Sequence, residues 1–296
     1  MLSSRLDSWL ARRSGPRPSD ASISAESVRM IDTPAGSLRV FDSASANPCV
    51  VFAPDGPNVI EHYAALTRIL SPHLRVVCFD MPGFGFSLPA HSYRHSLDQG
   101  ARAILAVLDR LEIATATLAF SCANGLYALC AARIASPKIA SLFLSQTPSL
   151  AAMHAWTDRI IPWPLRVPVV GQMVGRLSQH KAAHDWYDIA LPTTTDREPF
   201  RRLAREALAG GGCFCLAGVV QGLCRESAAS FKNVSTPCTM IWGEKDRSHR
   251  YTKAESLLEG VPQAHIVRFA ECGHFPDLEA PERYAKLLLD HVKEYA

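Results

Sequence analysis

The chain has 296 residues, 48% of them hydrophobic and 20% charged, which excludes fibrous, low-complexity and disordered classes of protein. Its 31 Lys and Arg and 28 Asp and Glu leave a net charge of +3, too small for a nucleic-acid-binding protein. The sequence contains no apolar run near the roughly 20 residues that span a bilayer, so we expect no membrane partner. The length suits one large α/β unit with an inserted segment.

Residues 1–25 are expected to form a flexible, amphipathic lead-in to the folded core. They lack the long apolar stretch and the cleavage site of a secretory signal, which predicts a cytoplasmic protein. The nine Cys are an odd number scattered through apolar segments. This distribution is typical of reduced thiols packed as small core residues, not of a disulfide framework.

Strand-like runs alternate with helical patterns along the chain, which predicts an α/β fold with a mostly parallel sheet covered by helices. Strands are expected, in chain order, at 28–31, 38–41, 49–53, 74–80, 117–121, 140–145, 238–242 and 264–269. Helices are expected at 60–70, 97–111, 125–134, 252–259 and 281–294. The first two strands should form an antiparallel pair, because a short Pro- and Gly-containing turn joins them.

Residues 149–234 interrupt this alternation and show no strand pattern. We interpret this segment as a helical cap inserted into a core made of residues 26–148 and 235–296. A cap that covers a pocket also lines it, so its tryptophans are candidate substrate-binding residues. These are Trp156, Trp163 and Trp186.

Three short segments carry a family resemblance. The sequence DMPGFGFS at 80–87 follows an expected buried strand, and its glycines allow a sharp turn at the strand's carboxyl end, where α/β folds bind ligands. The sequences WGEKD at 242–246 and CGHFP at 272–276 follow the last two expected strands. In this order the three segments resemble the cap-bearing branch of the α/β-hydrolase superfamily, from about residue 28 to the C-terminus.

The resemblance implies an α/β-hydrolase fold with a catalytic triad, in which Asp246 is the acid and His274 the base. It also implies a nucleophile on a strained strand-to-helix turn within 118–129. Residues 118–129 can be aligned with the elbow of the family in two ways. The spacing of the flanking elements favours the alignment in which Cys122 is the nucleophile. The alternative alignment makes Ser121 the nucleophile, between two small alanines. A thiol at a helix N-terminus meets backbone N–H donors and the positive end of the helix dipole, which favour the thiolate.

The resemblance further implies an oxyanion hole made of the backbone N–H groups of Gly56 and Ala123. The chain has Pro54-Asp55 where the family usually has His-Gly. We expect the Asp55 side chain to cap the following helix and not to point into the site.

A thiol nucleophile favours activated acyl groups, because an intermediate formed on Cys expels an alkoxide poorly. We therefore expect a thioesterase that acts on a small-molecule acyl substrate, with no cofactor and no metal. The excess of basic residues lies in 149–234, and an acidic acyl-carrier protein is a candidate partner for it. The basic residues concentrate at Arg197, Arg201, Arg202 and Arg205.

Three alternatives stay open at this point. The first is an esterase or lactonase that uses Ser121. The second is an acyltransferase or cyclase that passes the same acyl-enzyme to an alcohol or amine. The third is a ligand-binding protein of the same fold without catalysis, against which the intact Asp246 and His274 argue.

Overall fold

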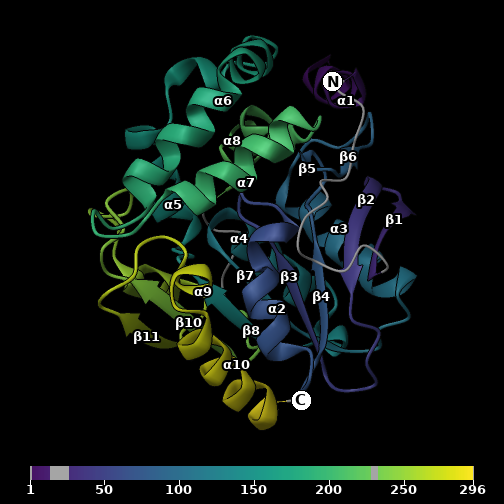
Figure 1. The fold of residues 1–296 in the computed structure, drawn as a ribbon, viewed down its shortest axis with the longest axis vertical. Helices are drawn as coiled ribbons and strands as arrows, with labels where there is room; N and C mark the ends of the chain where they lie inside the picture. The colour runs from purple at the N-terminus through teal and green to yellow at the C-terminus, as the bar shows by residue number, and fades with distance from the viewer. Residues whose placement is uncertain (1, 14–26, 228–232, 296) are drawn as a thin grey trace.

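A computed structural model describes residues 2–13, 27–227 and 233–295 of the chain, and a nine-stranded sheet flanked by helices lies at its centre (Figure 1). The strands of this sheet are β1 (Val28–Thr33), β2 (Gly36–Asp42), β3 (Cys49–Ala53), β4 (Arg75–Phe79), β6 (Leu88–Pro89), β7 (Ala116–Phe120), β8 (Ile139–Ser145), β10 (Cys238–Gly243) and β11 (His265–Phe269). They follow the order β1-β2-β4-β3-β7-β8-β10-β11, with β6 paired to β2.

The pairs that β2 makes with β1, β4 and β6 are antiparallel, and the other pairs of this sheet are parallel. The predicted α/β class with a mostly parallel sheet is therefore confirmed. The strands β3, β4, β7, β8, β10 and β11 occur at the predicted places within a few residues.

Helices cover both faces of the sheet because its strands are apolar on both sides. The helices α3 (Leu97–Arg110) and α4 (Cys122–Ile134) pack on one face, and α2 (Ala64–Leu70) and α10 (Pro281–Tyr295) pack on the other (Figure 1). Consecutive residues of β7 show the alternation: Leu118 belongs to the first apolar cluster and Ala119 to the second.

Local structure departs from the expectations at a few helices. The expected helix 60–70 begins as a 3₁₀ turn, η2 (Ile60–Tyr63), before it becomes α2. The expected helix 252–259 is entirely 3₁₀, η6 (Ala254–Glu259). Two short 3₁₀ turns, η3 (Ser136–Lys138) and η4 (Trp163–Arg166), were not expected.

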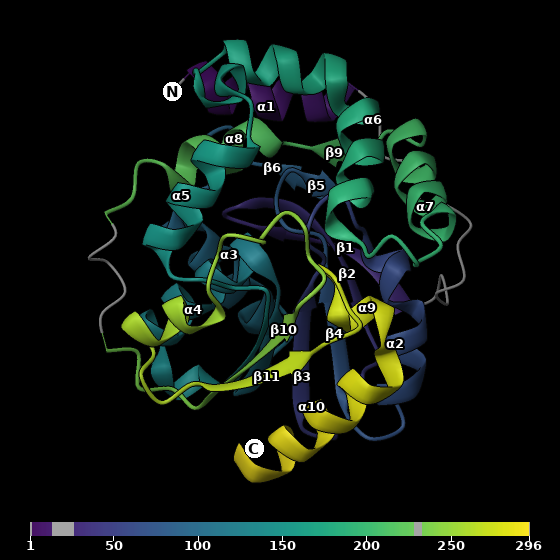
Figure 2. The same cartoon turned by 90° about the vertical axis from the view of Figure 1, so that its left-hand side faces the viewer.

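Between β8 and β10 the chain forms α5 (Leu150–Ile160), η4, α6 (Val170–Ala190), α7 (Glu198–Ala209) and α8 (Leu216–Leu223). We call these elements the upper helices, because they lie above the sheet in Figures 1 and 2. They are not free of strands as expected: β9 (Cys213–Phe214) pairs antiparallel with β5 (Phe84–Gly85). This pairing joins the upper helices to the glycine-rich turn.

The glycine-rich turn at 80–87 is held by its aspartate. Asp80 accepts hydrogen bonds from the backbone N–H groups of Ile60, at 3.2 Å, and Phe86, at 3.0 Å. Gly85 has φ 50°, and a Cβ there would lie 2.2 Å from the Asp80 carboxylate. A side chain at this position would therefore break the turn, which explains the glycine.

The first described segment is a helix, α1 (Leu2–Arg13), that packs on α6, α8 and β6 (Figure 2). The part of the expected lead-in between α1 and residue 27 lies outside the described residues. None of the described helices is long and apolar enough to cross a membrane.

Candidate active site

The turn from β7 into α4 has the geometry of a nucleophile elbow. Ser121 continues the strand, with φ −115° and ψ 151°, and bridges to Ser145 of β8. Cys122 then opens α4 with φ 51°. A positive φ is strained for a residue with a side chain, and such strain concentrates where a reactive group must be held out of the chain's path.

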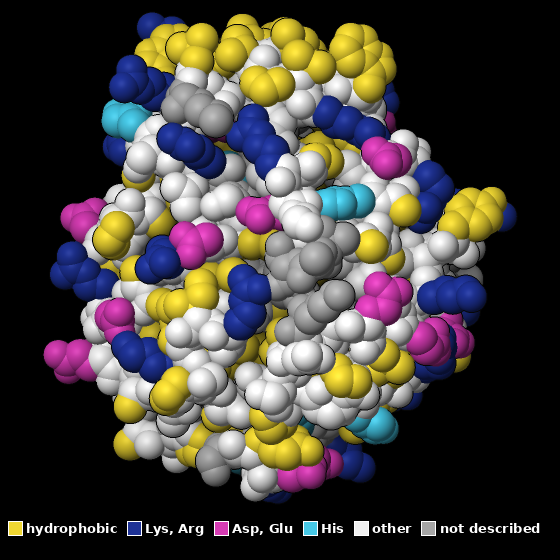
Figure 3. Space-filling view, turned by 180° about the vertical axis from the view of Figure 1, so that it is seen from behind, with side chains coloured by type: hydrophobic (Ala, Val, Ile, Leu, Met, Phe, Trp, Pro, Cys, Tyr) yellow, Lys and Arg dark blue, Asp and Glu magenta, His cyan; other side chains and the backbone are white. Residues whose placement is uncertain are grey.

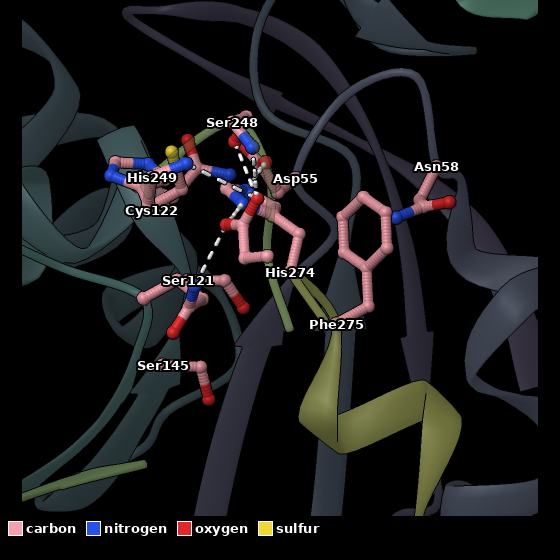
Figure 4. A network of polar contacts seen from close by, with 12 residues as sticks. Asp55, Asn58, Ser121, Cys122, Ser145, Ser248, His249, His274 and Phe275 are labelled. Carbon is pink, nitrogen blue, oxygen red and sulfur yellow. Dashed lines mark hydrogen bonds and ion pairs between the residues drawn. The ribbon is translucent and has the colours of Figure 1, made fainter. Parts of the chain in front are cut away.

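The two candidate nucleophiles point to different places. Cys122 lines a cavity beneath the upper helices and lies beside His249 (Figure 4). Ser121 is buried, its Oγ lies 3.4 Å from a carboxylate oxygen of Asp277, and it is not among the residues that line the cavity. Of the two residues, only Cys122 faces the space that a substrate would occupy.

The elbow is fitted closely to its neighbours. A Cβ at Gly125 would lie 2.1 Å from Oγ1 of Thr147, so α4 approaches the end of β8 as closely as it does because residue 125 is glycine. Asn124 is large for the position it occupies, and its Nδ2 donates to the backbone carbonyl of Pro54 at 3.0 Å. This bond ties the elbow to the loop that contains Gly56.

His274 and Asp246 form a pair at the ends of the last two strands. The His274 Nδ1 lies 2.6 Å from Oδ2 of Asp246. Although burial alone would raise the pKa of Asp246, the charge of His274 and hydrogen bonds lower this pKa to about 2. A Cβ at Gly243 would lie 1.8 Å from the Gly273 carbonyl oxygen, so a glycine is needed to bring the two loops together.

Two further residues fix the Asp246 carboxylate. Ser248 donates to Oδ1 from its backbone N–H, at 2.8 Å, and from its hydroxyl, at 2.7 Å. Gln146 donates from Nε2 to Oδ2 at 2.8 Å and accepts from the Gly243 backbone N–H at 2.8 Å. Sequence reasoning missed this role of Gln146, although its place directly after β8 is a signal that could have indicated it.

Asp55 points into the site and does not cap the next helix, so that expectation is wrong. Its Oδ2 lies 3.2 Å from Nε2 of His274 (Figure 4). Asp80, not Asp55, accepts from the N–H of Ile60 at the start of η2. Burial raises the pKa of Asp55 above its ordinary value, and hydrogen bonding to His274 partly offsets this effect.

The thiol of Cys122 is not a preformed thiolate. Burial and, to a smaller extent, the charge of Asp55 raise its pKa to about 11, although His274 and the N–H of Ala123 act in the opposite direction. The N–H of Ala123 at the helix N-terminus favours the thiolate as expected, but desolvation outweighs this effect. To act as a nucleophile, Cys122 would have to lose its proton to a base.

His274 can be that base only in its neutral form. Burial opposes its charged form, but Asp246, Cys122 and Asp55 together hold the pKa of His274 well above its ordinary value, which makes the neutral form a strong proton acceptor. One ring nitrogen of His274 and Sγ of Cys122 lie within 4.8 Å of each other. The structure therefore brings together Cys122, Asp246 and His274.

His249 is a member of the site that sequence reasoning missed. Its ring stacks on His274, with centroids 5.4 Å apart and planes at 19°, and on Trp156 at 5.2 Å. Burial lowers its pKa to about 3, so the ring is neutral, and neither ring nitrogen has a hydrogen-bond partner among the described residues.

One atom each of Cys122, His249 and His274 lies within 4.8 Å of the others, which is a spacing that could hold a metal ion. The near-parallel stacking of the two imidazoles argues against this use, because nitrogen ligands bind a metal in the plane of their rings. The stacked geometry therefore disfavours a metal ion between these two rings.

A cavity of about 470 Å³ lies over the elbow and is lined mostly by apolar side chains. Asp55, Gly56, Cys122 and Ala123 line it at the sheet side, so the two expected oxyanion-hole residues flank the thiol. Side chains of the upper helices form the rest of the lining. They include Met153, Ile160, Leu165, Val174, Ile189 and Val219.

The three candidate tryptophans do not all lie at the cavity. Trp156 and Trp186 line the cavity, and Trp186 also contacts the His274 ring edge to face at 5.1 Å. Trp163 does not line it and is 72% exposed, so its assignment as a substrate-binding residue is wrong. The neighbouring Pro162 and Leu165 face the cavity, which turns Trp163 outward.

The basic residues of α7 are largely paired. Arg201 contacts Asp188 at 2.7 Å, and Arg205 contacts Glu198 at 2.9 Å. Arg202 lies 3.8 Å from Glu206. These local ion pairs neutralise much of the charge that the sequence suggested as a docking surface.

The geometry agrees with what comparisons with known proteins show. The model of the alpha/beta hydrolase family matches residues 50–287. A pimeloyl-[acyl-carrier protein] methyl ester esterase from Aromatoleum aromaticum is 30% identical over 80% of this chain and 94% of its own length. The dihydrolipoyllysine-residue acetyltransferase component of the acetoin cleaving system of Pseudomonas putida is 27% identical over 95% of this chain and 70% of its own length.

Solved structures show the same fold. An epoxide hydrolase from Vigna radiata matches with a TM-score of 0.71 at 16% identity, over 92% of this chain and all of that one. A thermophilic esterase from Thermogutta terrifontis matches with a TM-score of 0.70 at 17% identity, over 90% of this chain and 98% of that one. At these identities the likeness concerns the fold alone.

Proposed function

Because the chain belongs to the alpha/beta hydrolase family, we propose that it hydrolyses acyl substrates through a covalent acyl-enzyme on Cys122. The observation that carries this proposal is the position of Cys122. It combines a φ of 51° at the elbow, exposure to the apolar cavity and proximity to His274. Esterase-type hydrolysis is the activity that the family and the relatives support; the thiol mechanism is our addition.

In the acylation step, Sγ of Cys122 loses its proton to Nε2 of His274 and bonds to the substrate carbonyl carbon. The carbonyl electron pair moves to the oxygen, where the N–H groups of Gly56 and Ala123 would stabilise it. The intermediate then collapses and expels the leaving group, which takes the proton from Nε2. Asp246 holds the ring in the required tautomer throughout, from 2.6 Å.

In the deacylation step, a water molecule gives a proton to Nε2 of His274 and its oxygen attacks the acyl carbon. The Cys122 sulfur leaves and regains the proton from Nε2, which releases a carboxylic acid. In the free site the Asp55 carboxylate is within hydrogen-bond distance of Nε2 of His274, so it must move away from Nε2 in both steps. Its raised pKa makes a neutral carboxyl accessible, and a neutral carboxyl gives up the contact at lower cost than an ion pair does.

We propose a thioester as the substrate. The tetrahedral intermediate formed by Cys122 on an oxyester would expel thiolate in preference to alkoxide and so return to substrate. A thioester offers two sulfur leaving groups of similar quality, so the enzyme need supply only positioning and stabilisation of the oxyanion. The apolar cavity of about 470 Å³ suits the acyl chain.

We propose a carrier protein as one source of this acyl group. The relative from Aromatoleum aromaticum is named for a substrate bound to an acyl-carrier protein. In this chain the exposed Arg202 and Arg205 of α7 offer cationic side chains to such a partner, although both have acidic neighbours.

Transfer of the acyl group to another nucleophile is the competing reaction, and the relative from Pseudomonas putida is named as an acetyltransferase component. The apolar lining of the cavity favours this reaction where it limits the access of water. Product analysis with added alcohols or amines distinguishes the two: hydrolysis gives only free acid, whereas transfer gives the new ester or amide.

Substitutions at the elbow test the proposal. We expect Cys122→Ala to lose turnover of short acyl thioesters by at least about a thousandfold, because the covalent step is removed. Ser121→Ala is the matched control, since it alters the neighbouring buried residue and should retain most activity. An active Cys122→Ala with an inactive Ser121→Ala would overturn the proposal.

A further inference from the structure

The exposed apolar side chains of this protein are concentrated on one surface. Most of the large hydrophobic residues that the structure leaves exposed lie on α1, η4 and the first half of α6, which are adjacent (Figure 2). We call this surface the apolar face. It consists of Leu2, Trp9, Trp163, Val170, Met173 and Leu177.

Figure 3 shows this concentration as a row of hydrophobic side chains along the top of the molecule, with Lys and Arg side chains directly below it. Leu2 is 69% exposed and Leu177 is 83% exposed. Such exposure is unusual for leucine, and contiguous apolar surface rimmed by charge marks a site of interaction.

The helix α1 is oriented with its polar side inward. Ser4, Asp7, Ser8 and Ala11, at helical spacing, are buried against the protein, whereas Leu2 and Trp9 are exposed and Leu6 and Leu10 are half-buried. Polar bonds hold this orientation: the Ser8 hydroxyl donates to the Pro89 carbonyl at 2.9 Å. Burial of an amphipathic helix normally covers its apolar side, so this arrangement keeps the apolar side free for something else.

A second polar bond fixes the same orientation. The Asp7 carboxylate accepts from Nε2 of Gln172 on α6 at 3.1 Å, and both residues are buried. Between the two helices a shallow open groove is lined by Leu6, Trp9 and Met173 together with Arg5. The apolar face is therefore built from both helices, with a cation within it.

The exposed charges of α1 and of the first half of α6 have one sign, whereas beside η4 the exposed Asp158 pairs with Arg166. Arg5, Arg12 and Arg13 are exposed on α1, and Asp7, the acidic residue of this helix, is turned inward. On α6 the first acidic residue is Asp185, beyond the apolar face. Apolar side chains with a cationic border match the surface of a bilayer that contains anionic lipid.

The apolar face adjoins the active-site cavity. The helix α6 carries Met173 and Leu177 on the outside, while the adjacent Val174 and Ser178 line the cavity. In the same way Trp163 is exposed while Pro162 and Leu165 line the cavity. A partner bound to the apolar face would be separated from the site at Cys122 by the thickness of one helix.

We propose that the apolar face docks the protein on the surface of a membrane containing anionic lipid, with the side chains of α1 and α6 inserted among the headgroups. This proposal departs from the expectation of no membrane partner, because a helix that lies in the interface needs no segment long enough to span the bilayer. The proposal concerns the surface alone and holds whichever residue is the nucleophile.

Sedimentation with vesicles tests it, using phosphatidylcholine alone and phosphatidylcholine mixed equally with phosphatidylglycerol. We expect the full chain to bind the anionic vesicles, and to bind less at high salt or to neutral vesicles. Met173→Glu should weaken binding at least about tenfold, because it places a charge on the apolar face. Met30→Glu is the matched control: Met30 is 45% and Met173 46% exposed, but Met30 lies on β1.

Charge removal provides a second variant, which keeps every apolar side chain of the face although it removes the contact of Arg13 with the Trp9 ring. Arg5→Gln combined with Arg13→Gln should weaken binding to anionic vesicles about fivefold for each charge removed. The binding of this variant should also depend less on salt than the binding of the wild type. Thermal melting and hydrolysis of a short soluble acyl thioester, unchanged in each variant, show that the fold is intact.

Three results would overturn the proposal. The first is a full chain that stays in the supernatant with both kinds of vesicle. The second is an equal loss of binding for Met173→Glu and Met30→Glu. The third is a dimer in solution that Met173→Glu dissociates while vesicles capture neither form, because the face would then join two copies of the chain.

Discussion

The carboxylate of Asp55 lies 3.2 Å from Nε2 of His274, on the side of the ring opposite the nitrogen that Asp246 holds. His274 thus lies between two carboxylates, one on each nitrogen. In the proposed mechanism the first fixes the ring, and the second must leave Nε2 before Nε2 can accept the thiol proton. The charge of Asp55 also raises the pKa of Cys122.

Asp55→Asn should make Cys122 more reactive, because the charge of Asp55 raises the pKa of this thiol. We expect the rate of alkylation by iodoacetamide to reach its plateau at lower pH; a displacement of about one pH unit would raise the rate at neutral pH about tenfold. Alkylation is followed by mass in a Cys224→Ala background, since Cys224 is the exposed thiol of the described chain. An unchanged pH profile would show that Asp55 does not influence the thiol.

His274→Ala and Asp246→Asn should both lose most acyl turnover while the protein stays folded. We expect kcat to fall about 10³- to 10⁴-fold, with the larger loss for His274→Ala, because His274 carries the proton and Asp246 only orients it. Steady-state kinetics with a short acyl thioester measures the loss. Near wild-type rates for His274→Ala would remove the triad assignment.

Gln146→Leu should reduce kcat with little change in KM. Gln146 does not line the cavity, but it holds Asp246 at 2.8 Å and the N–H of Gly243 at 2.8 Å. Loss of such a supporting bond costs roughly 10- to 100-fold where it orients a reactive histidine. Gln146→Glu is the comparison, because it keeps the shape and the acceptor but places a second carboxylate beside Asp246. A loss confined to KM in Gln146→Leu would contradict the positioning role.

Asp7→Asn should alter the pH dependence of stability. Burial raises the pKa of Asp7 from 3.8 to about 7, so the folded protein binds its proton more tightly than the unfolded chain does. The free energy of unfolding of the wild type therefore falls as pH rises from about 4 to about 7 through this group, with an upper bound on the order of 4 kcal/mol. The amide introduced by the substitution cannot ionise, so the variant should melt higher than the wild type above pH ~7 and the gain should shrink toward pH ~4. A gain that does not depend on pH would show that ionisation of Asp7 is not its source.

Charge reversal at Arg202 and Arg205 tests the carrier-protein partner. Both side chains are exposed, whereas Arg201 is mostly covered by its contact with Asp188 and should be left in place. We expect kcat/KM for a carrier-bound acyl thioester to fall and to become less sensitive to salt, while a free thioester is unaffected. If the variant has the same kcat/KM as the wild type for both the carrier-bound and the free thioester, this docking surface is excluded.

The sheet and the order of the site segments could be predicted from the sequence, because strand alternation and glycine-rich turns depend on neighbouring residues. The orientation of Asp55 could not, because its partner His274 lies far away in the chain and outweighs a local capping bond. The stack of His249 on His274 is a tertiary contact of the same kind. Trp163 faces outward because Leu165 of the same short turn packs inward, and a turn of this length has no periodicity from which to infer it.

The pKa of Cys122 could not be predicted either. The local pattern, a thiol at a helix N-terminus, favours a thiolate, but the burial that raises its pKa to about 11 results from the upper helices closing over the elbow. Likewise the sequence of α1 shows that it is amphipathic, but only its contacts with Gln172 and Pro89 show which side is buried.

Trapping of the acyl-enzyme tests the central claim most directly. The protein is mixed with an activated acyl thioester, quenched in acid during turnover, and digested for peptide mapping by mass spectrometry. The account predicts an acyl group on Cys122, attached by a thioester that hydroxylamine at neutral pH removes, and no such adduct in Cys122→Ala. An acyl group on Ser121, stable to that treatment and retained in Cys122→Ala, would contradict it.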